Sequence, residues 1–455
     1  MFAMVSDTFS NYFRCPAKFA RFSGPARNGE DLGAFRMHDV VSSGLSHLWG
    51  RSSNRNEFVD LSDLVYSDAD GVHLPFYVDE VVESLRRERY LSAWQVGPAS
   101  GVIGSLYSAL RPSLTVGMRK HLQRFYLRKR RNTRFPKWPI DDSVDFLMRE
   151  LISHVAQGLN EQIPFIWFWP DRYRSCLAMT HDVEEEPGRA FCSELMSIDD
   201  SYGIVSSFQV VPEQRYTVTN AFLEEIRSRG FELNVHDLNH RCDLFTNREL
   251  FLQSIGKLKG YADQWHARGF RAGAMYRNAD LMAELPFAFD MSFPSAAHLE
   301  PQAGGCCTVM PYLLGDLVEL PLTTTQDYTL RHILGESSID LWNQEIDFLR
   351  ERNALISFII HPDYLTDVPG RRLYLALLER LATLRREGTI WFAKPKQVAD
   401  WWRDRSQMSI VGEAGHLHIV GPSADRASLA FARIENQRLH FDLYEKSPIF
   451  WAHSF

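Results

Sequence analysis

Acidic and histidine side chains follow apolar segments at two places in the second half of the chain. Residues 176–186 read C-L-A-M-T-H-D-V-E-E-E, so a short apolar run is followed at once by Asp182 and Glu184. About fifty residues later another apolar run precedes His236 and His240, whose imidazoles can converge if the turn between them is helical. Carboxylates and imidazoles are ligands of zinc, and a bound metal can activate water. These residues indicate a metal-assisted hydrolase.

Two further titratable groups stand at the ends of apolar runs. Arg271 lies in F-R-A-G-A-M-Y, and His361 ends the most apolar run of the chain, L-I-S-F-I-I-H-P-D-Y. A solvated acidic loop or a surface histidine pair is the commoner explanation for any one of these motifs alone. Because a charged group at the end of a buried strand is costly unless it is paired or functional, the ordered set favours a shared site.

Beyond residue 175 short apolar runs alternate with helical periodicity. This alternation over some 230 residues predicts an α/β fold with a parallel sheet, closed or nearly closed into a barrel whose chemistry lies at the carboxyl ends of the strands. The expected strands are 177–180, 204–211, 231–235, 270–272, 287–291, 317–320, 355–360 and 389–392, and the expected helices are 221–229, 248–267, 339–351 and 372–386.

The remaining chain predicts two further parts. Residues 1–160 are expected to form a partly helical N-terminal region, residues 165–404 the barrel, and residues 405–455 a small antiparallel β appendage. The basic segment 119–137 is expected to be a solvated helix face, with a surface for anionic saccharides or lipid headgroups as the alternative.

Composition excludes several classes of protein. With 45% hydrophobic residues, 24% charged residues and a net charge of −7, the chain has the composition of an ordinary soluble protein. We expect no nucleic-acid partner, since the chain is acidic overall, and no transmembrane segment or secretory signal. The cysteines are not spaced as a disulfide framework, which favours reduced thiols and a cytoplasmic location.

The ordered motifs T-x-D-x-E, H-x-x-x-H, the arginine motif and apolar-apolar-His-Pro resemble the polysaccharide deacetylases of carbohydrate esterase family 4, the NodB-homology domain, over roughly residues 170–403. The stretches R-F-P-K-W-P, P-Q-A-G-G-C-C-T and V-E-L-P-L-T also resemble a bacterial group of such proteins with an extra N-terminal region. The resemblance implies a deformed (β/α) barrel, one divalent ion, usually zinc, and removal of an N-acetyl or other acyl group from a saccharide, such as a polysaccharide precursor.

The resemblance also implies a role for each motif residue. His236 and His240 would bind the metal with Glu184, or with Asp182 itself. Asp182 would act as general base, held ionised by Arg271, and the general acid would be His361. A backbone N–H near residues 275–276 would help to hold the oxyanion.

Some positions depart from the family pattern. Val183 stands where a metal-binding acid is common, Gly273 where proline is common, and Asp237 where Ser or Thr normally follows the first histidine. His181, at a usually aromatic position, is expected to add a ligand or a contact behind one, and Asp290 is the candidate for the family's fourth motif. The departures at Val183 and Gly273 favour one alternative, a catalytically silent carbohydrate-binding or scaffold protein of the same fold. A second alternative is an amidase acting on a non-sugar amide on the same barrel.

Overall fold

The computed structural model describes residues 3–24, 34–37, 40–43, 59–60, 64–68, 71–91, 135–412 and 416–444. Of the basic segment 119–137, only the last three residues lie within this part, so the surface predicted there falls almost wholly outside the described residues. In the described part of the chain, no helix combines the length and the apolar character that crossing a membrane requires.

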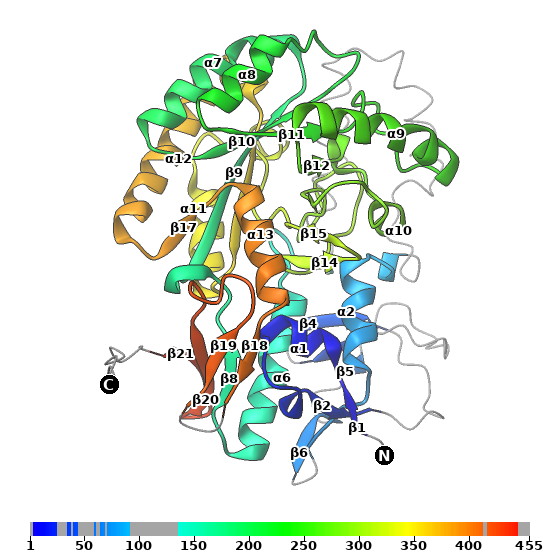
Figure 1. The fold of residues 1–455 in the computed structure, drawn as a ribbon, viewed down its shortest axis with the longest axis vertical. Coiled ribbons are helices and arrows are strands. Elements are labelled where there is room, and N and C mark those ends of the chain that lie inside the picture. The colour runs from blue at the N-terminus through cyan, green and yellow to red at the C-terminus, as the bar shows by residue number, and fades with distance from the viewer. Residues whose placement is uncertain are drawn as a thin grey trace, which may run out of the picture.

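A curled sheet forms the centre of the upper half of the molecule (Figure 1). Its strands run in the order β14-β15-β13-β12-β11-β10-β9-β16, with β17 paired to the first residues of β9. All neighbours are parallel except β14 and β15. The strands are β9 (Ser175–Val183), β10 (Ser206–Val210), β11 (Glu232–His236), β12 (Gly269–Arg271), β13 (Phe289–Asp290), β14 (Tyr312–Leu314), β15 (Leu317–Glu319), β16 (Leu355–Ile360) and β17 (Ile390–Phe392). Each strand expected from the apolar runs is present.

The segment that follows β15 meets β16 through side-chain hydrogen bonds instead of a backbone ladder, so the described sheet does not close into a continuous barrel. Thr323, which follows β15, donates from Oγ1 to the carbonyl of Leu355 on β16 at 2.8 Å. Thr324 likewise donates to the carbonyl of Ser357 at 2.7 Å, and the Ser357 hydroxyl donates to the carbonyl of Pro321. These hydroxyl groups satisfy buried polar atoms of the backbone where no regular ladder continues.

Helices cover the outer side of the sheet (Figure 1). The side chains of Thr219, Asn247 and Asp367 cap three of them by accepting backbone N–H groups of the first turn. The four expected helices are present, and α7, α10 and α13 were not among them; α7 begins with E-P-G, and proline is common at this position of a helix. These helices are α7 (Glu186–Ser201), α8 (Asn220–Ser228), α9 (Arg248–Trp265), α10 (Ala279–Met282), α11 (Asp340–Glu351), α12 (Val368–Glu387) and α13 (Pro395–Ser406).

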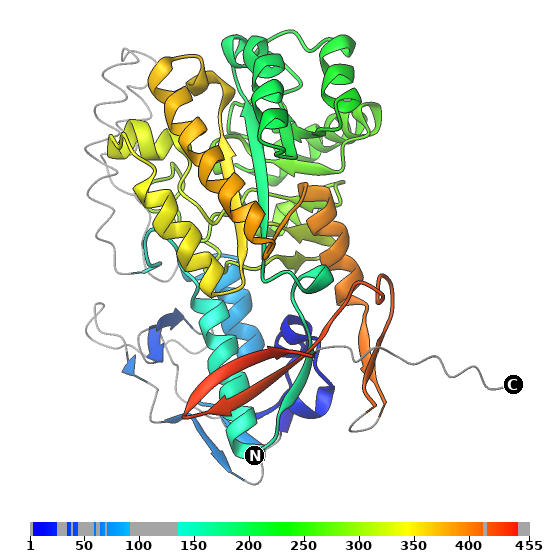
Figure 2. The same ribbon diagram turned by 90° about the vertical axis from the view of Figure 1, so that its left-hand side faces the viewer.

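Elements from both ends of the chain pack together in the lower half of the molecule (Figure 2). The strand β8 (Ile163–Ile166), which precedes the barrel, pairs with the C-terminal strands in the order β21-β20-β8. The elements here are β1 (Ala3–Val5), α1 (Asp7–Phe13), β2 (Arg21–Ser23), β3 (Ala34–Met37), β4 (Val40–Ser43), β5 (Val59–Asp60), β6 (Tyr66–Asp68), β7 (Gly71–His73), α2 (Val78–Arg86), α6 (Ser143–Leu159), β8 (Ile163–Ile166), β18 (Ser409–Val411), β19 (His418–Val420), β20 (Leu429–Glu435) and β21 (Arg438–Leu443).

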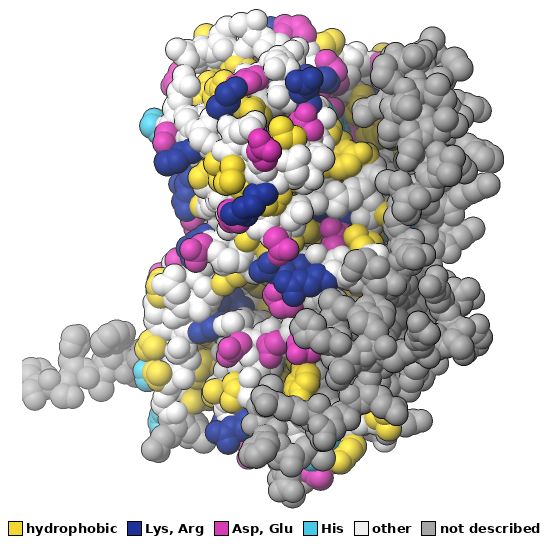
Figure 3. All heavy atoms as spheres, turned by 90° about the vertical axis from the view of Figure 1, so that its right-hand side faces the viewer, with side chains coloured by type: hydrophobic (Ala, Val, Ile, Leu, Met, Phe, Trp, Pro, Cys, Tyr) yellow, Lys and Arg dark blue, Asp and Glu magenta, His cyan; other side chains and the backbone are white. Residues whose placement is uncertain are grey.

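One hydrophobic core joins the two halves. Phe13 of α1, Phe165 of β8 and Phe441 of β21 pack edge to face, with ring centroids 5.1 to 6.1 Å apart. The same buried cluster continues through β9 and β16 into the barrel. On the described part of the face in Figure 3, acidic and basic side chains are interspersed. The hydrophobic core is therefore continuous across the domain boundaries predicted near residues 160 and 404, and the division into three domains stays a prediction.

Candidate metal and acid–base site

The parallel sheet brings the predicted residues to one edge. Asp182 lies next to the last residue of β9, His236 ends β11 and Arg271 ends β12 in register beside it. His361 directly follows β16, which pairs with β9. Since parallel strands all end at the same side of a sheet, side chains that are far apart in sequence meet here.

The strand alternation decides which acids reach the site. Asp182 and Glu184 are two residues apart and therefore share a face, whereas Val183 between them faces the opposite side and is fully buried in the core. His181 lies on that side as well. The acid-x-acid spacing thus places two carboxylates at the site.

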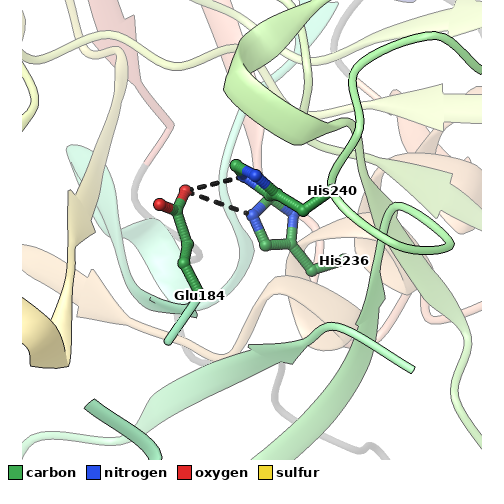
Figure 4. Close-up of side chains that lie close together, drawn as sticks. All are labelled: Glu184, His236 and His240. Carbon is green, nitrogen blue, oxygen red and sulfur yellow. Dashed lines mark ion pairs between the residues drawn. The ribbon is translucent and has the colours of Figure 1, made fainter. Parts of the chain in front are cut away.

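Glu184, His236 and His240 converge on one point (Figure 4). Glu184 Oε1 lies 2.9 Å from His240 Nε2 and 3.6 Å from His236 Nε2. The three atoms lie within 4.8 Å of one another. Burial alone would raise the pKa of Glu184, but the imidazoles of His240 and His361 outweigh it and hold the pKa well below its usual value.

The loop that carries the second histidine is not helical. Residues 238–240 form bends, and Asp237 and His240 have φ of 54° and 56°. The two imidazoles therefore converge without the helical turn that the i, i+4 spacing would allow, in a loop with two left-handed residues. His236 Nδ1 lies 3.1 Å from the carbonyl of Arg271, and a hydrogen bond from that nitrogen leaves Nε2 with its lone pair toward Glu184.

Arg271 holds Asp182 on the sheet side of the site. Its Nη1 donates to Asp182 Oδ1 at 2.8 Å and to Thr180 Oγ1 at 2.7 Å, and its Nε donates to the carbonyl of Met291 at 3.0 Å. Burial raises the pKa of Asp182, but Arg271 and the nearby imidazoles outweigh this effect and lower it. Asp182 Oδ2 lies 3.8 Å from His236 Nε2. A deeply buried carboxylate is thus kept ionised beside the three converging atoms.

His361 lies on the other side, and its partner was missed in the sequence. Its Nδ1 lies 2.6 Å from Asp327 Oδ1, and its backbone N–H donates to Asp327 Oδ2 at 2.8 Å. Its Nε2 lies 3.5 Å from Glu184 Oε1. Burial lowers the pKa of His361, but Asp327 and Glu184 outweigh it and raise the pKa well above its usual value. The signal for Asp327 in the sequence was an acid a few residues beyond the V-E-L-P-L-T strand.

Two expectations differ from the structure, those for His181 and for the N–H groups of residues 275 and 276. His181 points away from the site, where its Nε2 meets Asp199 at 2.9 Å, so it adds neither a ligand nor a contact behind one. Asp290 stays only a candidate for the fourth motif; it lies beside Glu319, and its carboxylate accepts the N–H and hydroxyl of Ser292. The N–H groups of residues 275 and 276 already donate within their own turn, to the carbonyls of residues 272 and 273.

Asp363, a second acid not predicted from the sequence, connects the loop after β9 with the turn after β16. Asp363 follows His361 by two residues, and its carboxylate accepts the N–H of Gly188 at 2.8 Å and that of Glu184 at 3.4 Å. A Cβ at position 188 would lie 2.4 Å from Asp363 Oδ2, so this approach requires glycine. The loop after β9 is thereby fixed to the turn after β16.

No family model matches the chain, and no curated protein matches it significantly. Several solved structures are similar to about half of it. A structure assigned as a polysaccharide deacetylase from Mycobacterium smegmatis has a TM-score of 0.42 at 20% identity and covers 52% of this chain and 93% of its own. One assigned in the same way from Pseudomonas aeruginosa PAO1 has 0.38 at 17% identity, with 52% and 93% covered. Puue allantoinase has 0.38 at 16% identity, with 52% and 92% covered. The solved structures similar to this chain therefore include polysaccharide deacetylases, the family that its sequence motifs resemble.

Proposed function

We propose that this chain is a metal-dependent hydrolase that removes an N-acetyl or other acyl group from a saccharide. The observation that carries the proposal is the position of Glu184, His236 and His240 between two opposed pairs. Asp182 with Arg271 stands on one side and His361 with Asp327 on the other. Hydrolysis of an amide needs a proton acceptor for water and a proton donor for the leaving amine, and the two pairs can supply them.

The three converging side chains fit a zinc-like cation. They offer one carboxylate oxygen and two imidazole nitrogens, the mixed donor set of catalytic zinc sites that keep a further position open. The Nε2 atoms of His236 and His240 are buried, and neither makes a well-formed hydrogen bond to a described protein group. When bound, such an ion polarises the acyl carbonyl and makes water acidic enough to lose a proton near neutral pH. Asp182 is an additional oxygen donor within reach of the same site.

In this proposal Asp182 Oδ2 accepts the proton of the attacking water. Oδ1 is occupied by Arg271, which keeps the carboxylate ionised and oriented. His361 donates from Nε2 to the leaving nitrogen, while Nδ1 stays hydrogen-bonded to Asp327. Asp327 thereby sets the tautomer and the direction of the ring, as an acid does in other histidine-based sites.

The site geometry supports hydrolysis of an acyl bond. The expectation that the substrate is a saccharide comes from the resemblance of the motifs to those of polysaccharide deacetylases. The presence of both opposed pairs supports an enzyme over a silent carbohydrate-binding protein. Hydrolysis of a non-sugar amide stays the second candidate, because fold alone does not determine the substrate. The cytoplasmic location stays a prediction, as does the surface contact through residues 119–137.

Metal content and acetate release test the proposal together. We expect about one zinc ion per chain in the purified protein, with most of it lost in His236→Ala and His240→Ala, because removing one of three protein ligands opens the site. Acetate release from a panel of N-acetylated and O-acetylated saccharides, with a cyclic amide alongside, identifies the bond. Asp182→Asn should retain zinc and lose turnover. A folded protein that binds no metal would refute the proposal, and an active Asp182→Asn variant would refute the role of Asp182.

A further inference from the structure

Asp237 is a buried acid beside the histidine loop with no function in the proposed reaction. Its side chain is 2% exposed and its φ is 54°. One carboxylate oxygen, Oδ1, accepts the N–H of Leu238 at 2.7 Å, and the backbone N–H donates to the carbonyl of Arg271 at 2.7 Å. The other oxygen, Oδ2, makes no hydrogen bond to any described residue. Two anchors therefore fix a carboxylate whose free oxygen points at a neighbour.

That neighbour is Gly273, two residues after Arg271. A Cβ at position 273 would lie 2.5 Å from Asp237 Oδ2 and 3.3 Å from His240 Cδ2. Gly273 is not among the residues with positive φ, so its backbone conformation is one that alanine adopts readily. The requirement for glycine here comes from the space that Asp237 and His240 occupy.

We infer that Asp237 and Gly273 form a matched steric pair that positions His240. The carboxylate fills the space that a side chain at 273 would take, and it holds the loop 237–240 against the turn after β12. An acid at 237 is then compatible only with glycine at 273. The departures from the family pattern at 237 and 273 therefore compensate each other. Gly273 is then not a sign that the site has lost its activity.

The steric pair affects the proposed metal site through His240, because His240 and Asp237 both contact the space beside Gly273. Displacing the carboxylate by about 1 Å would carry the loop and the imidazole with it, because the carboxylate and its own backbone are both anchored to neighbouring residues. This last step depends on the proposed metal-binding role of His240. The steric pairing itself does not.

A double-mutant cycle tests the pairing, with Gly273→Ala, Asp237→Ser and the combination of both. Thermal unfolding of the metal-free protein is the first measurement, and zinc affinity by titration calorimetry is the second. We expect Gly273→Ala to lower the unfolding midpoint by several degrees and to weaken zinc binding about 10-fold or more, the range seen when residues behind a metal ligand are changed. Serine is shorter than aspartate, so Asp237→Ser should remove most of both effects when added to Gly273→Ala.

Two controls separate shape from other causes. Asp237→Asn keeps the volume of the side chain, so it should not rescue Gly273→Ala. Gly260→Ala adds a Cβ on the exposed face of α9, where no atom lies within 4 Å, and should leave both measurements unchanged or slightly improved.

If Gly273→Ala does not fold alone, the combined variant is compared with Asp237→Ser, and the two should unfold within a few degrees of each other. Wild-type behaviour of Gly273→Ala, or equal rescue by asparagine and serine, overturns the inference. A wild-type protein that binds no zinc refutes the proposed function instead, and the unfolding midpoints still decide the pairing.

Discussion

Glu345 is a buried carboxyl group whose replacement should stabilise the protein in a pH-dependent way. It lies on α11 with 1% of its surface exposed, and both of its oxygens accept hydrogen bonds from Thr325, one from the N–H at 3.0 Å and one from the hydroxyl at 2.5 Å. Burial raises its pKa from 4.5 to about 8, and the two hydrogen bonds offset only part of that effect. No cation is among the groups that shift it.

The size of the effect follows from the proton balance of folding. Between pH 4.5 and about pH 8 the unfolded chain releases the proton of Glu345 while the folded chain keeps it, so the free energy of unfolding falls as pH rises through this range. Each pH unit costs about 1.36 kcal/mol, which gives about 3 kcal/mol at pH 7 for a fully buried group. Glutamine has the same shape and does not titrate. Glu345→Gln should therefore gain this amount over wild type at pH 7 and almost nothing below pH 4.5.

Thermal unfolding of both proteins at a series of pH values between 4.5 and 8.5 measures the effect. The midpoint of Glu345→Gln should exceed that of wild type by several degrees at pH 8, and the difference should shrink steadily toward pH 4.5. Glu379→Gln, an exposed glutamate on α12 without an ion pair among the described residues, is the control and should show no such trend. A difference that is constant with pH, or a variant less stable than wild type at pH 8, would refute the reasoning.

Three further predictions concern the site and the core. Asp327→Asn should lower kcat for acetate release about 10- to 100-fold through the loss of the acid that orients His361, with zinc content by metal analysis unchanged. Addition of zinc at 100 times its Kd should raise the free energy of unfolding by about 2.7 kcal/mol, and His236→Ala should abolish that gain in a thermal shift assay. Arg405 is buried and donates to the carbonyls of residues 12, 166 and 167. Arg405→Leu leaves these acceptors without donors and should lower the free energy of unfolding in urea by about 3 kcal/mol. A urea midpoint equal to that of wild type would contradict this account.

The parts of the site that sequence could predict are those that end a strand. Apolar runs mark buried parallel strands, and such strands end at one edge, so Asp182, His236, Arg271 and His361 could be grouped before their contacts were known. The alternation of side chains along β9 also explains why Glu184, and not the residue at 183, faces the site. Local periodicity and topology were sufficient for these residues because each follows directly from its own strand.

The residues that sequence could not predict depend on contacts between distant segments. Asp327 begins a helical turn directly after Thr323 and Thr325, which bond to β16 and to Glu345 of α11, and no local pattern encodes either contact. His181 shows the reverse case. A histidine next to a site acid is a reasonable candidate ligand, but its partner Asp199 comes from the following helix and lies on the other face of the strand. In both cases the decisive contact is long-range, and chain order alone does not give it.

The N-terminal region supports the loop that follows Arg271. Glu88 follows α2, is 8% exposed, and pairs through both oxygens with Arg277, which is 5% exposed. The same guanidinium donates to the carbonyls of Met275 and Ala303, so it braces the turn after β12 from within the barrel. Removing one partner of a buried ion pair costs about 3–5 kcal/mol, because the other charge is left without a counter-ion. The turn after β12, which begins two residues beyond Arg271, is therefore fixed to Glu88 of the N-terminal region by a buried ion pair.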